Sequence, residues 1–261
     1  MSGPGAGTLA EVGGHATWYA EYGSGDPLVY LHGGFSSSSE LAPVRDAYAA
    51  RFHVFTPDRR GHGRTPDVPG PFSYELFAAD AIAFLEEVVG GPAHLVGFSD
   101  GAIVALQVAL ARPDLVRRQA LISGQFHQSG LLPVFFHGSD AVAQLSASPM
   151  AAAYAEESPD GAEHFAVVAA KGIENALTGP TLRAGQLAGV SARTLVMSGD
   201  DDAVSLEHTV EMYRSLPDAE LAVVPGTSHV LILEKPGLVA QLVLDFLTTD
   251  PVRTIAPVRR A

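Results

Sequence analysis

The sequence predicts an α/β fold in which a mostly parallel central sheet is covered by helices on both faces. Short apolar runs with the character of strands alternate with longer segments of helical period over most of the chain. One of these runs leads directly into a serine between glycines and then into an Ala-rich helical segment. Such alternation is typical of parallel sheets, because each connection between parallel strands places a helix on one face.

Six short, largely apolar runs are predicted to be strands. They cover residues 28–31, 53–56, 93–98, 118–122, 193–198 and 221–224. Two amphipathic helices accompany them. The first covers residues 74–88, where Ser73 can cap the N-terminus and Gly90, Gly91 and Pro92 end the helix. The second covers residues 238–247.

The alternation stops between residues 126 and 188, where aromatic residues, prolines such as Pro133, Pro149 and Pro159, and two Ala-rich helical pieces occur without a strand pattern. We interpret this segment as an inserted helical lid, and residues 1–125 and 189–261 as the α/β core. An insertion here would lie above the carboxyl edge of the sheet, where ligands of open α/β sheets bind. The alternative is a pair of surface helices that do not contact substrate.

Composition excludes several classes of function. The 261 residues contain no cysteine, which rules out disulfides, thiolate zinc sites and a cysteine nucleophile. The net charge of −13 and the lack of a broad basic face argue against a nucleic-acid partner. We find no membrane span, secretion signal, metal-ligand spacing or dinucleotide fingerprint. We therefore expect a cytoplasmic protein without metal or cofactor that acts on a small molecule; the sequence does not indicate an oligomeric state.

The run Gly97-Phe98-Ser99-Asp100-Gly101 has the pattern of a nucleophile elbow. Glycines on either side allow a tight strand-to-helix turn in which neighbouring backbone comes close, and the turn pushes the serine hydroxyl into a cleft. The preceding strand pattern and the following helix pattern supply the context that the motif requires. Ser99 is therefore the candidate nucleophile.

A serine hydroxyl needs a base to accept its proton, and the base needs an acid to hold its tautomer. The aspartates at positions 200, 201 and 202 follow one predicted strand, and His229 follows the next. The carboxyl ends of parallel strands meet at one edge of a sheet, so Ser99, one of these aspartates and His229 can converge there. The residues alone do not decide between Asp201 and Asp202.

With these motifs the sequence resembles the α/β-hydrolase superfamily over nearly the whole chain, including the order Ser, Asp, His. The resemblance implies Asp202 as the catalytic acid and a structural role for His32 and His62. Some members carry the acid after the strand that follows the elbow, but Ser123-Gly124-Gln125 offers no carboxylate there. The motifs that carry the resemblance are Leu31-His32-Gly33-Gly34-Phe35, Asp58-Arg59-Arg60-Gly61-His62-Gly63-Arg64, Gly97-Phe98-Ser99-Asp100-Gly101, and Gly199-Asp200-Asp201-Asp202 with Ser228-His229.

A tetrahedral intermediate also needs hydrogen-bond donors for its oxyanion. The elbow provides the backbone amide of Asp100, at the start of a helix where the macrodipole favours negative charge. The resemblance assigns the second donor to the amide of Gly34, with Phe35 next in line. For the Asp100 side chain we expect a stabilising role at the helix start rather than direct catalysis.

Apolar residues that flank the catalytic loops or the lid are candidates for a substrate pocket, with ordinary core packing as the alternative. No Arg or Lys lies close in sequence to Ser99 or His229, which favours a small or medium uncharged substrate. The candidate substrate-binding residues are Phe35, Phe98, Phe126, Phe135, Phe136, Val204 and Val230.

The sequence therefore predicts a serine hydrolase that cleaves an ester-like bond of a largely apolar substrate through an acyl-enzyme. Lactone opening, amide or carbon–carbon bond cleavage, and perhydrolysis on the same three residues are alternatives within catalysis. A small-molecule receptor with a hydrolase fold is the alternative outside catalysis. The serine at the elbow excludes the related enzymes that use a carboxylate nucleophile there.

Overall fold

The central element is an eight-stranded sheet, in a computed structural model that describes residues 7–132, 140–252 and 254–256. The strand order is β1-β2-β4-β3-β5-β6-β7-β8, with antiparallel pairing at β1–β2 and β2–β4 and parallel pairing from β4 through β8. The sheet is thus mostly parallel, as predicted. The strands are β1 (Thr8–Val12), β2 (His15–Gly23), β3 (Pro27–Leu31), β4 (His53–Pro57), β5 (Ala93–Phe98), β6 (Val116–Ile122), β7 (Arg193–Asp201) and β8 (Ala219–Ser228).

Each of the six predicted strands is present, as β3 to β8. The sequence interpretation missed the hairpin of β1 and β2, which adds two antiparallel strands at one edge. Gly13 and Gly14 form its two-residue turn, and both have positive φ angles, of 58° and 80°. Two adjacent glycines between strands are a recognised hairpin signal, because such turns need positive φ at both positions.

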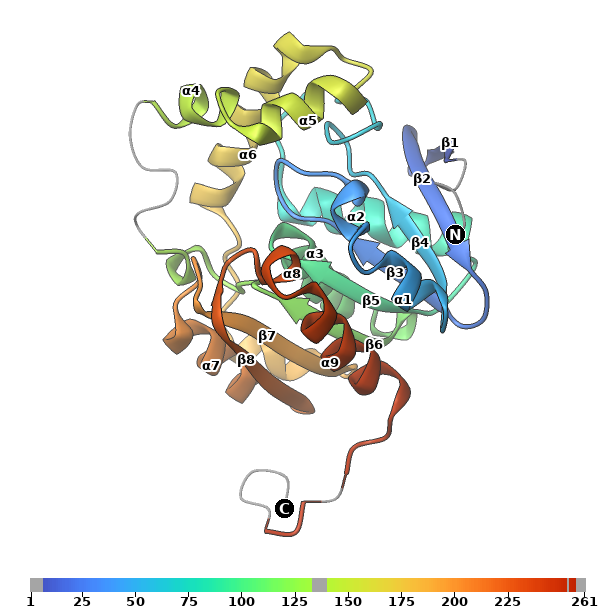
Figure 1. Cartoon of the computed structure of the whole chain (residues 1–261), viewed down its shortest axis with the longest axis vertical. Coiled ribbons are helices and arrows are strands. Elements are labelled where there is room, and N and C mark those ends of the chain that lie inside the picture. Colours follow the sequence, from blue (N-terminus) through green and yellow to red (C-terminus); the bar gives the residue numbers. More distant parts are fainter. Residues whose placement is uncertain (1–6, 133–139, 253, 257–261) are drawn as a thin grey trace.

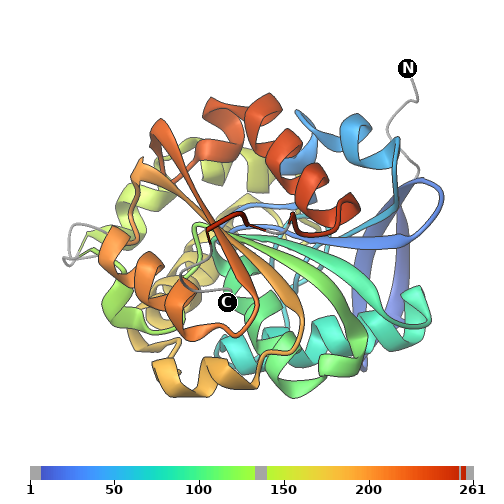
Figure 2. The ribbon, with the colours of Figure 1, turned by 90° about the horizontal axis from the view of Figure 1, so that it is seen from below.

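Helices cover both faces of the sheet (Figure 2). Helices α2, α3 and α7 lie on one face, and α1 and α9 lie on the other. The helices are α1 (Arg45–Ala49), α2 (Tyr74–Phe84), α3 (Asp100–Ala111), α4 (Ala141–Ser146), α5 (Pro149–Glu157), α6 (Phe165–Thr178), α7 (Leu206–Ser215), α8 (Leu231–Glu234) and α9 (Pro236–Thr248). Short 3-10 turns are η1 (Ser38–Leu41), η3 (Pro113–Leu115), η4 (Gln128–Gly130), η5 (Ala162–His164) and η6 (Ala184–Gly189), and η2 (Leu85–Val89) is a π turn. None of the described helices is long and apolar enough to cross a membrane.

The predicted first helix begins and ends where the sequence indicates. The Ser73 side chain accepts a hydrogen bond from the Leu76 amide, which satisfies one of the free N–H groups at the start of α2. After α2 the chain makes the π turn η2, and Gly90 closes it with a φ of 78°.

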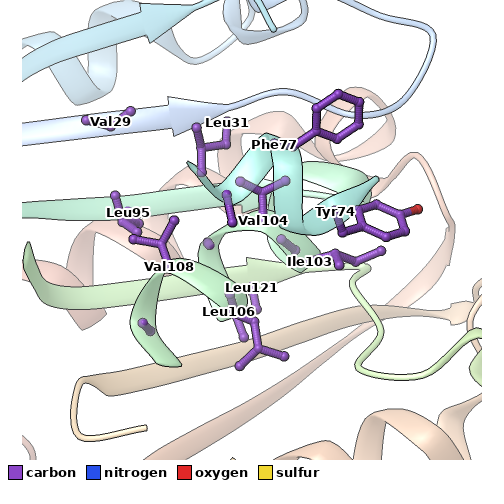
Figure 3. Packing of buried hydrophobic residues seen from close by; sticks show 14 of the residues in the cluster. Val29, Leu31, Tyr74, Phe77, Leu95, Ile103, Val104, Leu106, Val108 and Leu121 are labelled. Atoms are coloured by element: carbon purple, nitrogen blue, oxygen red, sulfur yellow. The ribbon is translucent and has the colours of Figure 1, made fainter. Parts of the chain in front are cut away.

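The hydrophobic core forms two clusters, one on each face of the sheet. In the first, side chains from β3, β5 and β6 meet those of α2 and α3 (Figure 3). Helix α3 is buried along most of its length, which fixes the residue at its N-terminus relative to the sheet. The labelled members of this cluster are Val29, Leu31, Tyr74, Phe77, Leu95, Ile103, Val104, Leu106, Val108 and Leu121.

Within residues 126–188, helices α4, α5 and α6 lie together at the top of Figure 1. Ion pairs join them to the loop of residues 58–68, which follows β4. Arg64 of this loop lies 2.6 Å from Glu157 at the end of α5. Asp67 lies 2.7 Å from Lys171 of α6 and 2.8 Å from His164. The 58–68 loop therefore holds the helical segment against the core.

Candidate active site

Ser99 lies in the sharp turn between β5 and α3. Its φ of 52° is unfavourable for a residue with a side chain and costs about 1 to 3 kcal/mol. The Ser99 amide donates a hydrogen bond of 2.8 Å to the Ile122 carbonyl of β6, which holds the turn in place. The glycines of the motif are needed for close packing: a Cβ on Gly101 would lie 1.9 Å from the Leu31 carbonyl oxygen.

Gly101→Ala is expected to lower the free energy of unfolding by about 3 kcal/mol or more, because β3 and α3 would have to separate inside the core. Gly237→Ala is the matched control. A Cβ on that helical glycine has no neighbour within 4 Å, and the change should stay below about 1 kcal/mol. Urea unfolding of both variants measures the difference. Equal stabilities would show that the close approach at Gly101 does not constrain the fold.

His229 connects Ser99 with Asp202. The Ser99 Oγ lies 2.9 Å from His229 Nε2, and His229 Nδ1 lies 2.7 Å from Asp202 Oδ1. Asp202 follows β7 and His229 follows β8, so residues distant in sequence meet at the carboxyl edge of the sheet. A proton on Nδ1, bonded to the carboxylate, leaves Nε2 free to accept the serine proton.

The Asp202 carboxylate is buried and fully engaged. Its Oδ2 accepts hydrogen bonds from the Ser123 hydroxyl at 2.6 Å and the Gly199 amide at 3.1 Å, and its Oδ1 accepts one from the Val204 amide. Burial opposes ionisation, but the hydrogen bonds from His229 and Ser123 and the attraction of His229 hold the pKa of Asp202 below its usual value. Asp202 therefore stays ionised beside His229.

The neighbouring aspartates occupy other places. Asp200 accepts a hydrogen bond from the Thr227 amide through its side chain. Asp201 is exposed, and its backbone pairs with Ser228. Of the three adjacent carboxylates, the structure brings that of Asp202 to His229.

The amides of Gly34 and Asp100 are adjacent to the elbow. In the described part of the chain, neither N–H group donates a hydrogen bond to another residue. The two positions are close: a Cβ on Gly34 would lie 2.7 Å from Asp100 Oδ2. Phe35 follows with a φ of 56°, and its ring lies against Gly172 of α6.

The Asp100 side chain is held at the start of α3. Its Oδ1 accepts a hydrogen bond of 2.8 Å from the Tyr74 hydroxyl, and its Oδ2 lies 3.8 Å from Arg59 Nη2. These contacts fix the carboxylate at the cavity wall.

The rings of His32 and His62 form hydrogen bonds with the backbone of the loop that follows β4. His32 Nε2 accepts a hydrogen bond from the Arg59 amide, and His62 Nδ1 lies 3.0 Å from the Arg60 carbonyl. Burial lowers the pKa of both rings, that of His62 to about 3, so both are neutral at physiological pH.

A cavity of about 1020 Å³ opens beside Ser99 and His229. Of the predicted pocket residues, Phe35, Phe98, Val204 and Val230 line it. The structure does not bring Phe126 to the cavity; its ring stacks on His208 at a centroid distance of 4.1 Å, because the His208 ring accepts the Phe126 amide proton and holds the two together. Phe135 and Phe136 lie outside the described residues.

The rest of the cavity wall was missed by the sequence interpretation. Much of it comes from helices α4, α5 and α6, where nothing in the local pattern distinguishes a cavity residue from a surface one. Glu40 and Tyr74 reach it from η1 and α2. The additional lining residues include Glu40, Tyr74, Ile103, Leu145, Met150, Tyr154, Gly172 and Leu233.

Carboxylates are the most numerous ionisable groups of the wall. Glu40, Asp100, Glu157, Asp201 and Asp202 line the cavity, and no Lys or Arg does so among the described residues. Residues 133–139, between described parts of the chain, contain neither residue type in the sequence. Within the described ranges, no three His, Asp or Glu side chains are grouped so that they could hold a metal ion.

The sequence model of the alpha/beta hydrolase family matches residues 28–242, which include β3 without its first residue, all of β4 to β8, and the three residues Ser99, Asp202 and His229. The chain belongs to the alpha/beta hydrolase family. In this family the chain is similar to the (E)-2-((N-methylformamido)methylene)succinate hydrolase of Acinetobacter baylyi, with 25% identity over 255 residues, 89% of this chain and 94% of the relative. It is 26% identical over 257 residues to the 2-hydroxy-6-oxo-6-phenylhexa-2,4-dienoate hydrolase of Burkholderia cepacia, which covers 86% of this chain and 88% of the relative.

Solved structures of the family share the fold. A serine hydrolase involved in carbazole degradation superimposes with a TM-score of 0.78 at 22% identity, over 93% of this chain and 98% of the other. The enol-lactonase of Burkholderia xenovorans gives a TM-score of 0.75 at 20% identity, over 93% and 100% of the two chains. The fold is therefore that of a family of hydrolases with diverse substrates.

Proposed function

We propose that this hydrolase cleaves an ester-like bond of a small, largely apolar substrate through an acyl-enzyme on Ser99. The observation that carries the proposal is the unbroken chain of hydrogen bonds from Ser99 Oγ through His229 to the buried Asp202 carboxylate. A strained serine at a helix start with an imidazole in proton-transfer reach is the arrangement that activates a hydroxyl.

In the proposed reaction, His229 Nε2 takes the Ser99 proton as Oγ attacks the substrate carbonyl. The amides of Gly34 and Asp100, with Phe35 next to them, would donate to the oxyanion, and one such donor contributes roughly 3 to 4 kcal/mol. His229 then gives the proton to the leaving group, and water releases the acyl group by the same route in reverse. Asp202 holds the His229 tautomer and stabilises its protonated form.

The acidic wall indicates the charge of the substrate. The two curated relatives named above are named for a succinate and a dienoate, both carboxylates. An anionic group in this cavity would face several carboxylates and meet no Lys or Arg of the described wall. We therefore assign an uncharged substrate to this chain, in keeping with its apolar phenylalanine and valine lining.

The helical segment completes the cavity. Leu145 of α4, Tyr154 of α5 and Gly172 of α6 line it together with Ser99 and His229 of the core. This supports residues 126–188 as a helical lid on a core formed by residues 1–125 and 189–261.

The same centre supports a second candidate, cleavage of a carbon–nitrogen bond in a neutral amide or carbamate. It is favoured by the Acinetobacter baylyi relative, whose named substrate carries an N-methylformamido group. The chemistry differs only in the leaving group, which needs the proton from His229 more than an alcohol does.

A substrate panel tests the proposal. p-Nitrophenyl butyrate should be hydrolysed with a kcat/KM at least about tenfold above that of the p-nitrophenyl monoester of succinic acid, which has the same acyl length and a terminal carboxylate. Neutral lactones, anilides and carbamates in the same assay identify the preferred bond. Equal or better use of the succinate ester would contradict the assignment of an uncharged substrate, and binding of the panel without turnover would favour a receptor.

A further inference from the structure

The peptide groups around Gly33 are held from two sides. The Gly33 N–H donates a hydrogen bond of 2.8 Å to Glu40 Oε1, and the Gly33 carbonyl accepts one of 2.8 Å from Arg59 Nη2. Gly33 directly precedes Gly34, the position next to the Asp100 side chain. The side chains of Glu40 and Arg59, which carry opposite charges, thus hold the backbone next to the candidate oxyanion donors.

Glu40 is itself fixed. It belongs to η1, and its Oε1 also accepts a hydrogen bond of 2.8 Å from the Tyr30 hydroxyl on β3. A Cβ on Gly33 would lie 3.0 Å from the Phe98 ring and 3.5 Å from Glu40 Oε2, so these side chains enclose the position. The loop between His32 and Phe35 therefore has little room to move while Glu40 keeps its acceptor in place.

We propose that Glu40 is a positioning residue that holds the Gly34 amide in line with the oxyanion by accepting the Gly33 N–H. The inference rests on the proposed acyl-enzyme function, because it concerns the donor loop of that reaction. Glu40 lines the cavity but is not required to contact the reacting atoms. Its effect passes through the backbone, so it changes the rate of the chemical step more than the binding of substrate.

The ionisation of Glu40 gives this role a pH dependence. Burial raises the pKa of Glu40 to about 7, against hydrogen bonds from Ser36, Tyr30 and Gly33 and the attraction of Arg59. Above that pH the carboxylate is a strong acceptor for the Gly33 N–H. Below it the protonated group is a weaker acceptor, so the activity should fall as pH decreases through this range.

Other titratable groups surround Glu40. Arg59 faces it from the 58–68 loop, and Tyr30 faces it from β3 with Tyr48 of α1 behind. Asp100 and His229 line the same cavity. His229 must be unprotonated to act as a base in every Glu40 variant as well, so the difference between their rate profiles reports on Glu40 alone.

Three variants test the proposal: Glu40→Leu, Glu40→Gln and, as a control, Glu21→Gln of an exposed carboxylate on β2. Glu40→Leu removes the acceptor and should lower kcat for p-nitrophenyl butyrate by at least about tenfold, with KM within about threefold. Glu40→Gln keeps an oxygen for the Gly33 N–H and should retain kcat within about threefold at pH 8. Its kcat relative to that of the unaltered protein should rise as the pH falls from 8 to 6, because protonated Glu40 and glutamine are both uncharged acceptors of the Gly33 N–H.

A Glu40→Leu variant with normal kcat would overturn the proposal, as would a Glu40→Gln variant that loses as much kcat as Glu40→Leu at every pH. If Glu40→Leu does not fold, the Glu40→Gln profile decides alone: an acid limb identical to that of the unaltered protein overturns the proposal. Failure of the proposed function is distinct, since it would appear as turnover that survives Ser99→Ala, whatever Glu40 does.

Discussion

Ser99→Ala is expected to lower kcat for p-nitrophenyl butyrate by about 10⁴- to 10⁶-fold while the protein stays folded. The substitution removes the single oxygen that lies 2.9 Å from His229 Nε2, and no other hydroxyl in the hydrogen-bonded chain can replace it. Backbone geometry should persist, because alanine is no more strained than serine at a φ of 52°. Stopped assays measure kcat, and thermal unfolding checks the fold.

The control is Ser146→Ala, which removes an exposed hydroxyl at the end of α4 and should leave kcat unchanged. A fluorophosphonate probe should label the unaltered protein and the control but not Ser99→Ala. Activity retained in Ser99→Ala would remove this residue from the mechanism. Tight ligand binding by the unaltered protein with no labelling would favour the receptor interpretation.

Asp202→Asn is expected to lower kcat by about 10³- to 10⁴-fold. The amide cannot stabilise a protonated His229, and its N–H₂ group favours the wrong tautomer of the ring when it takes the place of Oδ1, 2.7 Å from Nδ1. Asp201→Asn is the matched change one residue away. Its carboxylate is exposed and makes no described contact with His229, so kcat should stay within about twofold.

Rates of the two variants, measured on the same ester, separate the adjacent aspartates. A large loss in Asp201→Asn with a near-normal Asp202→Asn would transfer the role of the acid to Asp201. Comparable losses in both would mean that the negative charge of the β7 loop matters more than the hydrogen bond to His229.

The sequence predicted the parallel part of the fold because its strands are buried on both faces and read as continuous apolar runs. Strand β5, buried at every position, is the clearest case. The antiparallel hairpin of β1 and β2 was missed because its half-buried strands carry mixed polar residues. Its only strong local signal is the Gly13-Gly14 turn.

In the candidate site, too, some residues could be predicted from the sequence and others could not. Ser99, Asp202 and His229 stand in short motifs at strand ends, and such positions share one edge of a parallel sheet whatever the loops between them do. No comparable sequence pattern marks the residues of the cavity wall. Phe126 flanks the expected lid but packs on His208, whereas Tyr154 of α5 reaches the cavity across more than fifty residues of chain from Ser99. Contacts of this kind depend on tertiary packing that a local pattern does not contain.

The 58–68 loop makes contacts with two different parts of the molecule. Its Arg64 and Asp67 anchor the helices above the cavity, while its Arg59 bonds to the carbonyl of Gly33. One loop therefore connects the helices beside the cavity with the peptide group next to Gly34. Substitutions in this loop are therefore expected to disturb the shape of the cavity and the position of the Gly33 carbonyl at the same time.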